Sequence, residues 1–186
     1  MLFIISIMIV AEIMLIWLCI YYKKKSDHDG LSGLFNRNAV EKKINRVIIK
    51  QKYTHTMLMI DINNFKRFND TYGHHVGDSI IKHISYSLLK HFGDKCIIGR
   101  VGGDEFIVFT ARHGEDFNME RAIDSFLSSL DMNLNDSTVI RIDCSIGIAK
   151  SERGDNFYSI YCRSDKLMYD AKALKSLNTN KTADFK

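Results

Sequence analysis

The sequence predicts one domain of the α/β class, a mixed central sheet with helices on both faces, preceded by one transmembrane helix. The domain follows from apolar runs of strand length that alternate with stretches of helical periodicity from residue 36 onward. The membrane helix follows from a long apolar stretch at the start of the chain. A length of 186 residues suits one domain with one appended segment.

The apolar stretch, Leu2 to Tyr22, contains only two polar residues that interrupt its hydropathy, Ser6 and Glu12. As a helix it would reach about 30 Å, the thickness of the hydrocarbon core of a bilayer. Ionisable groups in hydrocarbon are costly and usually functional. Glu12 is therefore expected either to meet a membrane partner or to be tolerated as a protonated carboxyl.

Three lysines, residues 23–25, follow this stretch, and aromatic residues lie near the same end. A secretory signal would instead carry its positive charges before the apolar run. The positive-inside rule holds the lysine end in the cytoplasm. We therefore expect a single-pass helix over residues 1–22 in the cytoplasmic (inner) membrane, a basic juxtamembrane linker over residues 23–30, and a cytoplasmic domain after it.

The composition narrows the class of partner. The formal net charge is +4, part of it from the lysines beside the membrane stretch. No Arg/Lys stripe interleaved with aromatic residues is visible, so no nucleic-acid surface is expected. The four cysteines show no paired metal-ligand spacing, and disulfides are not expected in this compartment.

The first half of the domain alternates helix and strand. Apolar residues at helical intervals predict a helix from Asn36 to about Lys52, and the run THTMLMIDI predicts a buried strand over residues 54–62. A short helix is expected over residues 65–72, before Gly73. A longer amphipathic helix follows over residues 76–92.

The second half begins with a hairpin whose arms are CIIGRV and DEFIVFTA. Its turn is expected at Gly102 and Gly103, because glycine can take the positive φ values that tight hairpins need. An amphipathic helix over residues 119–130, an alternating strand over residues 137–150 and a helix from residue 157 to about 177 complete the order.

Carboxylates lie at two strand ends, Asp61 in MIDI and the pair Asp104–Glu105 at the hairpin. An ordinary solvated turn would explain the hairpin pair taken alone. If the two strands are neighbours, however, the carboxylates converge and repel one another unless a divalent cation is present. The pattern therefore predicts a Mg²⁺ site, with Mn²⁺ as the alternative ion.

Further polar residues follow Asp61 in NNFKRFNDTYGHHVGD. Lys66 would meet a phosphate as a point charge. Asn69 and Asp78 offer the donor and acceptor groups that suit a guanine edge. Together with the carboxylates, they indicate a site for a guanine nucleotide and its metal.

With these residues the chain resembles the GGDEF domain family, most of whose active members are diguanylate cyclases. Five blocks occur in the family's order: DGLSGLFNR (Asp29–Arg37), residues 61–78, RVGGDEF, SIGIA (Ser145–Ala149) and DKLMYDAK (Asp165–Lys172). The resemblance implies a nucleotidyl-cyclase-like palm over residues 31–178, with residues 179–186 as a C-terminal tail. It also implies a homodimer that condenses two GTP into cyclic di-GMP, releasing two pyrophosphates.

The resemblance also assigns roles to matching positions. It implies metal ligation by Asp61, Asp104 and the Ile62 carbonyl. It also makes Glu105 the group that takes or directs the proton of the 3′-hydroxyl. The catalytic candidates are the side chains of Asp61, Asp104 and Glu105. Substrate binding is implied for the following residues: Asn69, Asp78, Lys66, Phe65 and Lys172.

Three departures from the family pattern qualify this assignment. Asn63 stands where many members carry an aspartate, without removing a ligand. Ser176 replaces an arginine that would hold the γ-phosphate, so weaker GTP affinity is expected, with Lys175 as a partial substitute. Residues 93–96 lack both anchors of the family's inhibitory product site, so none is expected here. The rival reading is a GGDEF module that binds GTP or a protein partner without turnover.

Overall fold

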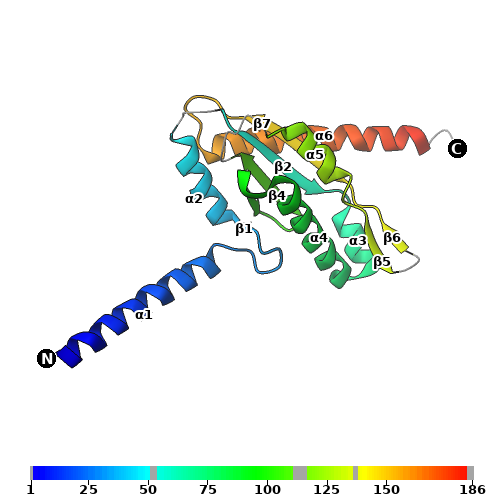
Figure 1. The fold of residues 1–186 in the computed structure, drawn as a ribbon. Helices are drawn as coiled ribbons and strands as arrows, with labels where there is room; N and C mark the ends of the chain where they lie inside the picture. Colours follow the sequence, from blue (N-terminus) through cyan, green and yellow to red (C-terminus); the bar gives the residue numbers. More distant parts are fainter. Residues whose placement is uncertain (1, 51–53, 111–116, 136–137, 184–186) are drawn as a thin grey trace.

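The structure, a computed structural model, describes residues 2–50, 54–110, 117–135 and 138–183. A long first helix, α1 (Leu2–Ser26), projects away from the other elements, which gather around one sheet (Figure 1). The segment Ile5–Tyr22 of α1 has a mean hydropathy of 2.2 and is unburied. By length and composition, α1 could cross a membrane.

In the part of the chain that the structure describes, the central sheet has five strands in the order β1-β3-β4-β2-β7. Only the β1–β3 pair is parallel, and the other neighbours are antiparallel. The sheet is therefore mixed, as the sequence predicts. The strands are β1 (Phe35–Asn36), β2 (Thr56–Ile62), β3 (Cys96–Arg100), β4 (Glu105–Thr110) and β7 (Cys144–Lys150).

Helices cover both faces of this sheet, which confirms the predicted layers. Successive side chains of β2 point to opposite faces. Met57 and Met59 pack in the core beneath α2 and α6, whereas Leu58 and Ile60 pack in the core beneath α4 and α5. The helices are α2 (Arg37–Ile48), α3 (Phe65–Tyr72), α4 (His74–Phe92), α5 (Met119–Leu127) and α6 (Phe157–Ala183), with a 3₁₀ turn, η1 (Gly93–Lys95), after α4.

The prediction of a single strand over residues 137–150 is wrong. Its first residue, Ser137, lies outside the described residues. Instead, β6 (Thr138–Ile140) pairs with β5 (Met132–Asn135) in a separate two-stranded sheet, and the chain then crosses to β7. The crossing is fixed by a tertiary contact, because the Asp143 carbonyl accepts a hydrogen bond from the Asn63 amide at 2.9 Å.

The expectation of positive φ at Gly102 and Gly103 is also wrong, since neither is among the glycines with positive φ. The connection between β3 and β4 has four residues, Val101 to Asp104, so it does not need a two-residue mirror-image turn. Gly102 instead lies close to Glu105. A Cβ atom there would lie 2.4 Å from a carboxylate oxygen of Glu105, so the end of that side chain would have to move.

The joint between α1 and the domain is a short hydrogen-bonded turn. The Ser26 carbonyl accepts from the Asn36 side-chain amide at 2.6 Å, and the Asp27 carbonyl accepts from the Asn36 backbone amide at 3.0 Å. The Asn36 Oδ1 atom also caps α2 by accepting from the Ala39 amide at 3.0 Å. One side chain thus ties the end of α1 to the start of α2.

Candidate active site

The predicted carboxylates converge at one end of the sheet. Asp61, near the end of β2, lies directly opposite Glu105 of β4 in the strand register. The Ile62 amide donates to the Asp104 carbonyl at 3.2 Å, which places Asp104 beside the same strand end. The side chain of Asp61 is only 10% exposed. Neighbouring strands therefore bring these acids together, as the sequence argument requires.

The cluster carries more negative charge than its surroundings neutralise. Burial raises the pKa of Asp104, and the nearby charge of Asp61 raises it further. Burial also raises the pKa of Glu105, as do the charges of Asp104 and Asp61. Among the described residues, Lys172 of α6 contacts this cluster, and its Nζ atom donates to Asp61 Oδ1 at 2.5 Å. The site is thus suited to receive further positive charge.

A hard divalent ion suits these donors. The predicted ligands, Asp61, Asp104 and the Ile62 carbonyl, offer oxygen alone, which Mg²⁺ prefers over the nitrogen and sulfur ligands that suit zinc. Within the described residues, no group of three or more Asp, Glu, His or Cys side chains forms a complete metal cage. Mg²⁺ is usually held by one or two carboxylates and completed by water and substrate phosphates, so an incomplete cage suits it.

Arg100 holds the loop that carries the signature. Its Nε and Nη2 atoms donate to the Gly103 carbonyl at 3.1 and 2.6 Å, and its Nη1 atom donates to Asp29 Oδ1 at 3.0 Å. Asp29 belongs to the DGLSGLFNR block, so one arginine links two distant blocks. The sequence argument assigned no role to either residue. The signal available in the sequence was that each residue lies in one of the family's blocks, Asp29 in DGLSGLFNR and Arg100 in RVGGDEF.

The two residues expected to read guanine lie near each other across the α3–α4 turn. A Cβ atom at Gly77 would collide with the side-chain oxygen of Asn69, so this glycine lets Asn69 lie against the first turns of α4. Asp78 is the next residue and is exposed. Phe65 is partly buried against the core at the start of α3, whereas Lys66 is exposed. Gly77 is a contributor that sequence reasoning missed.

Asn63 and Lys175 belong to a polar network beside the carboxylates. The Asn63 amide donates to Asp143 Oδ2 at 2.7 Å, and its oxygen accepts from the Ser145 hydroxyl at 2.8 Å. Lys175 Nζ donates to Asp143 Oδ1 and to the Cys144 carbonyl, both at 2.8 Å. An aspartate at position 63 could not donate to Asp143, which explains the asparagine physically.

This network changes what can be expected of Lys175. The side chain predicted to stand in for the missing arginine is already bound to Asp143 and to a backbone carbonyl. The side chain of Ser176, the residue in the arginine's place, lies outside the described residues. Any contact of Lys175 with a phosphate would have to compete with Asp143.

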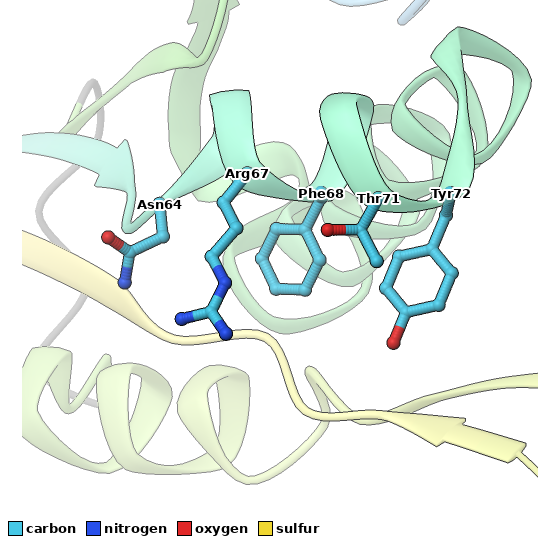
Figure 2. A pocket seen from close by; sticks show the side chains of 5 residues that line it. All are labelled: Asn64, Arg67, Phe68, Thr71 and Tyr72. Atoms are coloured by element: carbon cyan, nitrogen blue, oxygen red, sulfur yellow. The ribbon is translucent and has the colours of Figure 1, made fainter.

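Two cavities lie near these elements. One, of about 240 Å³, lies along α3, where Asn64, Arg67, Phe68, Thr71 and Tyr72 project to the same side (Figure 2). None of these is a predicted substrate residue. The other, of about 430 Å³, includes Gly93 and Cys96, where the family's product site would lie. Its described lining contains no arginine or aspartate: His28, Gly33, Leu34, Phe35, Leu89, Gly93, Cys96 and Ile98.

Comparison with known proteins identifies the family and supports the fold. Residues 26–177 match the family model described as diguanylate cyclase, GGDEF domain. Among solved structures, the coiled coil and GGDEF domain of DgcB from Caulobacter crescentus, in complex with c-di-GMP, has a TM-score of 0.77. It is 25% identical to this chain, and the match covers 88% of this chain and 90% of that one.

Two curated relatives have different activities in their names. The diguanylate cyclase VdcA of Vibrio cholerae is 34% identical over 158 residues, which are 82% of this chain and 46% of that protein. The cyclic di-GMP phosphodiesterase PdeR of Escherichia coli is 31% identical over 147 residues, which are 77% of this chain and 22% of that protein. The chain thus spans less than half the length of either relative.

Proposed function

The chain belongs to the GGDEF domain family, and from that premise we propose that it is a diguanylate cyclase anchored in the cytoplasmic membrane. It joins two GTP molecules into cyclic di-GMP and releases two pyrophosphates. The observation that carries this proposal is the convergence of Asp61, Asp104 and Glu105 at one end of the sheet, with Lys172 in contact. This arrangement combines a metal site with a cation for phosphate.

Each half of the reaction forms one bond and breaks one. The 3′-oxygen of one GTP bonds to the α-phosphorus of the other, and the bond from that phosphorus to the pyrophosphate oxygen breaks. Glu105, opposite Asp61 in the register, receives or directs the proton of the attacking hydroxyl. Two domains must face each other for reciprocal attack, so the active species is a homodimer.

The other residues bind and orient the nucleotide. Asn69, which lies against the backbone at Gly77, and Asp78, the residue after that glycine, hydrogen-bond the guanine edge. Lys66, the backbone at Phe65, and Lys172 hold the triphosphate. Mg²⁺, or Mn²⁺ in its place, would be held by Asp61, Asp104 and the Ile62 carbonyl, and supplies neutralisation of the charge that develops on the phosphoryl and leaving oxygens.

The test is product formation by the full chain, purified in detergent and incubated with GTP and Mg²⁺. We expect cyclic di-GMP from the wild type. In Asp104→Ala the yield of cyclic di-GMP should fall more than about 100-fold, because loss of a direct metal ligand should cost more than loss of an outer-shell partner. Asp70→Asn, which changes an exposed carboxylate on α3 without a predicted role, is the matched control. Wild-type protein that binds GTP but yields no product would contradict the proposal.

A second candidate is a GGDEF module that binds GTP or a protein partner at the membrane without turnover. Two residues favour it, because neither is placed to do the work of the family's arginine on the γ-phosphate. Ser176 cannot make the paired hydrogen bonds of a guanidinium, and Lys175 is already bound to Asp143. The likeness to PdeR, which is named a phosphodiesterase and not a cyclase, also favours it. Saturable GTP binding without product in the same assay would select this candidate.

The proposed cyclase lacks strong product inhibition at the family's inhibitory site. The cavity at Gly93 and Cys96 presents apolar side chains and histidine in place of the missing charged anchors. Cyclic di-GMP added to the assay should therefore leave the initial rate unchanged at concentrations comparable with the product formed. Tight binding abolished by substitutions at residues 93–96 would contradict this.

A further inference from the structure

Positive charge is concentrated next to the end of α1. Residues 37–50, which comprise α2 and the turn after it, carry five basic residues and one acidic residue, Glu41. The lysines at residues 23–25 add three more positive charges. Because the whole chain has a net charge of +4, the rest of the chain is net negative. The positive excess therefore belongs to two neighbouring segments of the fold.

α2 presents this charge on the side that faces away from the domain. Val40, Ile44 and Ile48 pack in the core on one side of the helix. The opposite side, which we call the α2 face, consists of four exposed residues at helical spacing: Lys42, Arg46, Ile49 and Lys50. Ile49 is 75% exposed. Basic side chains beside an exposed apolar one are typical of a helix that lies at a membrane interface.

The cations of the α2 face are not used by the fold. Two other cations of the same helix have partners: the Arg37 guanidinium lies 5.2 Å from the ring centre of Tyr161, and Lys43 Nζ lies 4.2 Å from that of Phe35. By contrast, the three cations of the α2 face form no hydrogen bond or ion pair with any residue that the structure describes. Their charge is available to a partner outside the domain.

The turn at Asn36 places the α2 face at the membrane. Asn36 immediately precedes α2, and its side-chain amide donates to the carbonyl of Ser26, the last residue of α1, at 2.6 Å. In Figure 1, α2 lies beside the end of α1 and runs across its direction. With α1 in the membrane as proposed, α2 lies along the cytoplasmic surface.

We propose that the α2 face docks on the anionic lipid headgroups of the cytoplasmic leaflet. The inference rests on the proposed membrane anchor and goes beyond the proposed reaction. Each lysine or arginine near such a surface strengthens binding about fivefold. Ile49 adds apolar contact at the boundary with the acyl chains. Because α1 holds α2 at a high effective concentration, a weak contact is sufficient. It gives the domain a second attachment and so one orientation.

The test uses the full chain in nanodiscs of phosphatidylcholine, with or without about one third of phosphatidylglycerol. Ile49→Cys, far along α2 from the tether, carries an apolar fluorophore, and nitroxide groups on the lipid headgroups quench it on contact. The exposed Cys19 and Cys162 are changed to serine. We expect at least about twofold more quenching with phosphatidylglycerol, and about 1 M salt should remove the difference.

Matched variants separate docking of this face from the effect of total charge. Glutamine at the three cations of the α2 face should abolish the extra quenching. A control triple loses the same charge from exposed lysines of α4 and α6 and should keep it: Lys82→Gln, Lys90→Gln and Lys166→Gln. A fluorophore at Tyr86→Cys, exposed on α4, should be quenched little in either membrane.

Three results would overturn the proposal. They are equal quenching at position 49 in the two membranes, equal loss in both triples, and equal phosphatidylglycerol-dependent quenching at position 86. A photoreactive label at position 49 that forms a protein adduct in bacterial membranes, without lipid quenching in nanodiscs, would overturn it in favour of a protein partner.

The same nanodiscs distinguish this inference from the proposals on which it rests. Trp17 is the one tryptophan of the chain, so lipids with brominated acyl chains report the insertion of α1 through its fluorescence. Trp17 without quenching would overturn the anchor and the docking together. Quenched Trp17 with position 49 insensitive to phosphatidylglycerol would overturn the docking alone. A chain that docks but forms no cyclic di-GMP would overturn the cyclase and leave the docking standing.

Discussion

Two cations on α6 each hold an aspartate, and they do so in different ways. Arg163 binds Asp155 through Nη1 and Nη2 at 3.0 and 2.6 Å. Asp155 also accepts from the Ser159 hydroxyl at 2.6 Å and from the Glu152 amide at 2.7 Å. Lys172 binds Asp61 through one contact, and its side chain is 44% exposed.

The difference separates a structural ion pair from a functional one. The hydrogen bonds of Arg163 and Ser159 hold the pKa of Asp155 well below its usual range, so its charge is fully satisfied within the fold. Asp61 faces two more carboxylates whose pKa values are raised. Lys172 makes a single contact to this cluster of acids, which leaves capacity for a metal and a phosphate, whereas both Nη atoms of Arg163 are bound to Asp155.

The largest effect on activity in this comparison is expected from Lys172→Met. It removes the cation that contacts Asp61 and that would meet the triphosphate, so kcat/KM for GTP should fall about 10- to 100-fold. Lys166→Met, an exposed lysine on the same helix, should change little. Steady-state kinetics of the full chain with Mg²⁺ measures both. Equal kcat/KM in the two variants would remove Lys172 from the site.

Asp155→Asn should show the opposite profile. Losing the charge-assisted hydrogen bonds to Arg163 costs about 2 kcal/mol of unfolding free energy, which lowers the midpoint of thermal unfolding by about 4–8 °C. GTP turnover well below that midpoint should stay unchanged. Glu152→Gln is the control, because Glu152 is exposed and 3.9 Å from Arg163. A loss of turnover without a change in midpoint would reverse the distinction between the pairs.

The same pair predicts a pH dependence. Because the folded-state pKa of Asp155 is depressed, its stabilisation is fully present above the unfolded value of about 3.9 and is lost as pH falls toward the folded value. The difference in unfolding midpoint between wild type and Asp155→Asn should therefore be constant above about pH 5 and shrink below about pH 4. A difference that grows on acidification would contradict the assignment.

The smallest effect is expected from Ser176→Arg, which adds a further cation to the same helix. An arginine side chain that reaches the γ-phosphate should lower KM for GTP about threefold. This is less than a full charge-assisted hydrogen bond would give. Ser176→Lys, a point charge, should lower it less. Unchanged KM in the arginine variant would show that the serine does not limit affinity.

The sequence predicted the parts of the fold that local patterns specify. The buried runs of β2 and β4 end in acids, so both the strands and the convergence of Asp61 with Asp104 and Glu105 could be inferred. β1 has only two residues, too few for a period, and it was missed. The break before β7 depends on the Asn63–Asp143 contact, between residues far apart in the chain.

The same limit applies to the candidate site. Motif positions named the acids and the nucleotide residues, but the supporting residues act through distant partners. Arg100 reaches Asp29, which is 71 residues away, and Gly77 matters through the side chain of Asn69. The sequence marks these residues as parts of blocks, whereas their purpose requires the three-dimensional contacts.

The turn at Asn36 and Asp29 also determines where the protein can be shortened. A fragment that begins at Ser26 retains both carbonyls bound by Asn36 and the carboxylate bound by Arg100. A fragment that begins at Gly30 retains every predicted catalytic residue but loses Asp29, so Arg100 keeps only its contacts with Gly103. We therefore expect the functional unit to begin several residues before the predicted start of the domain, inside the predicted linker over residues 23–30.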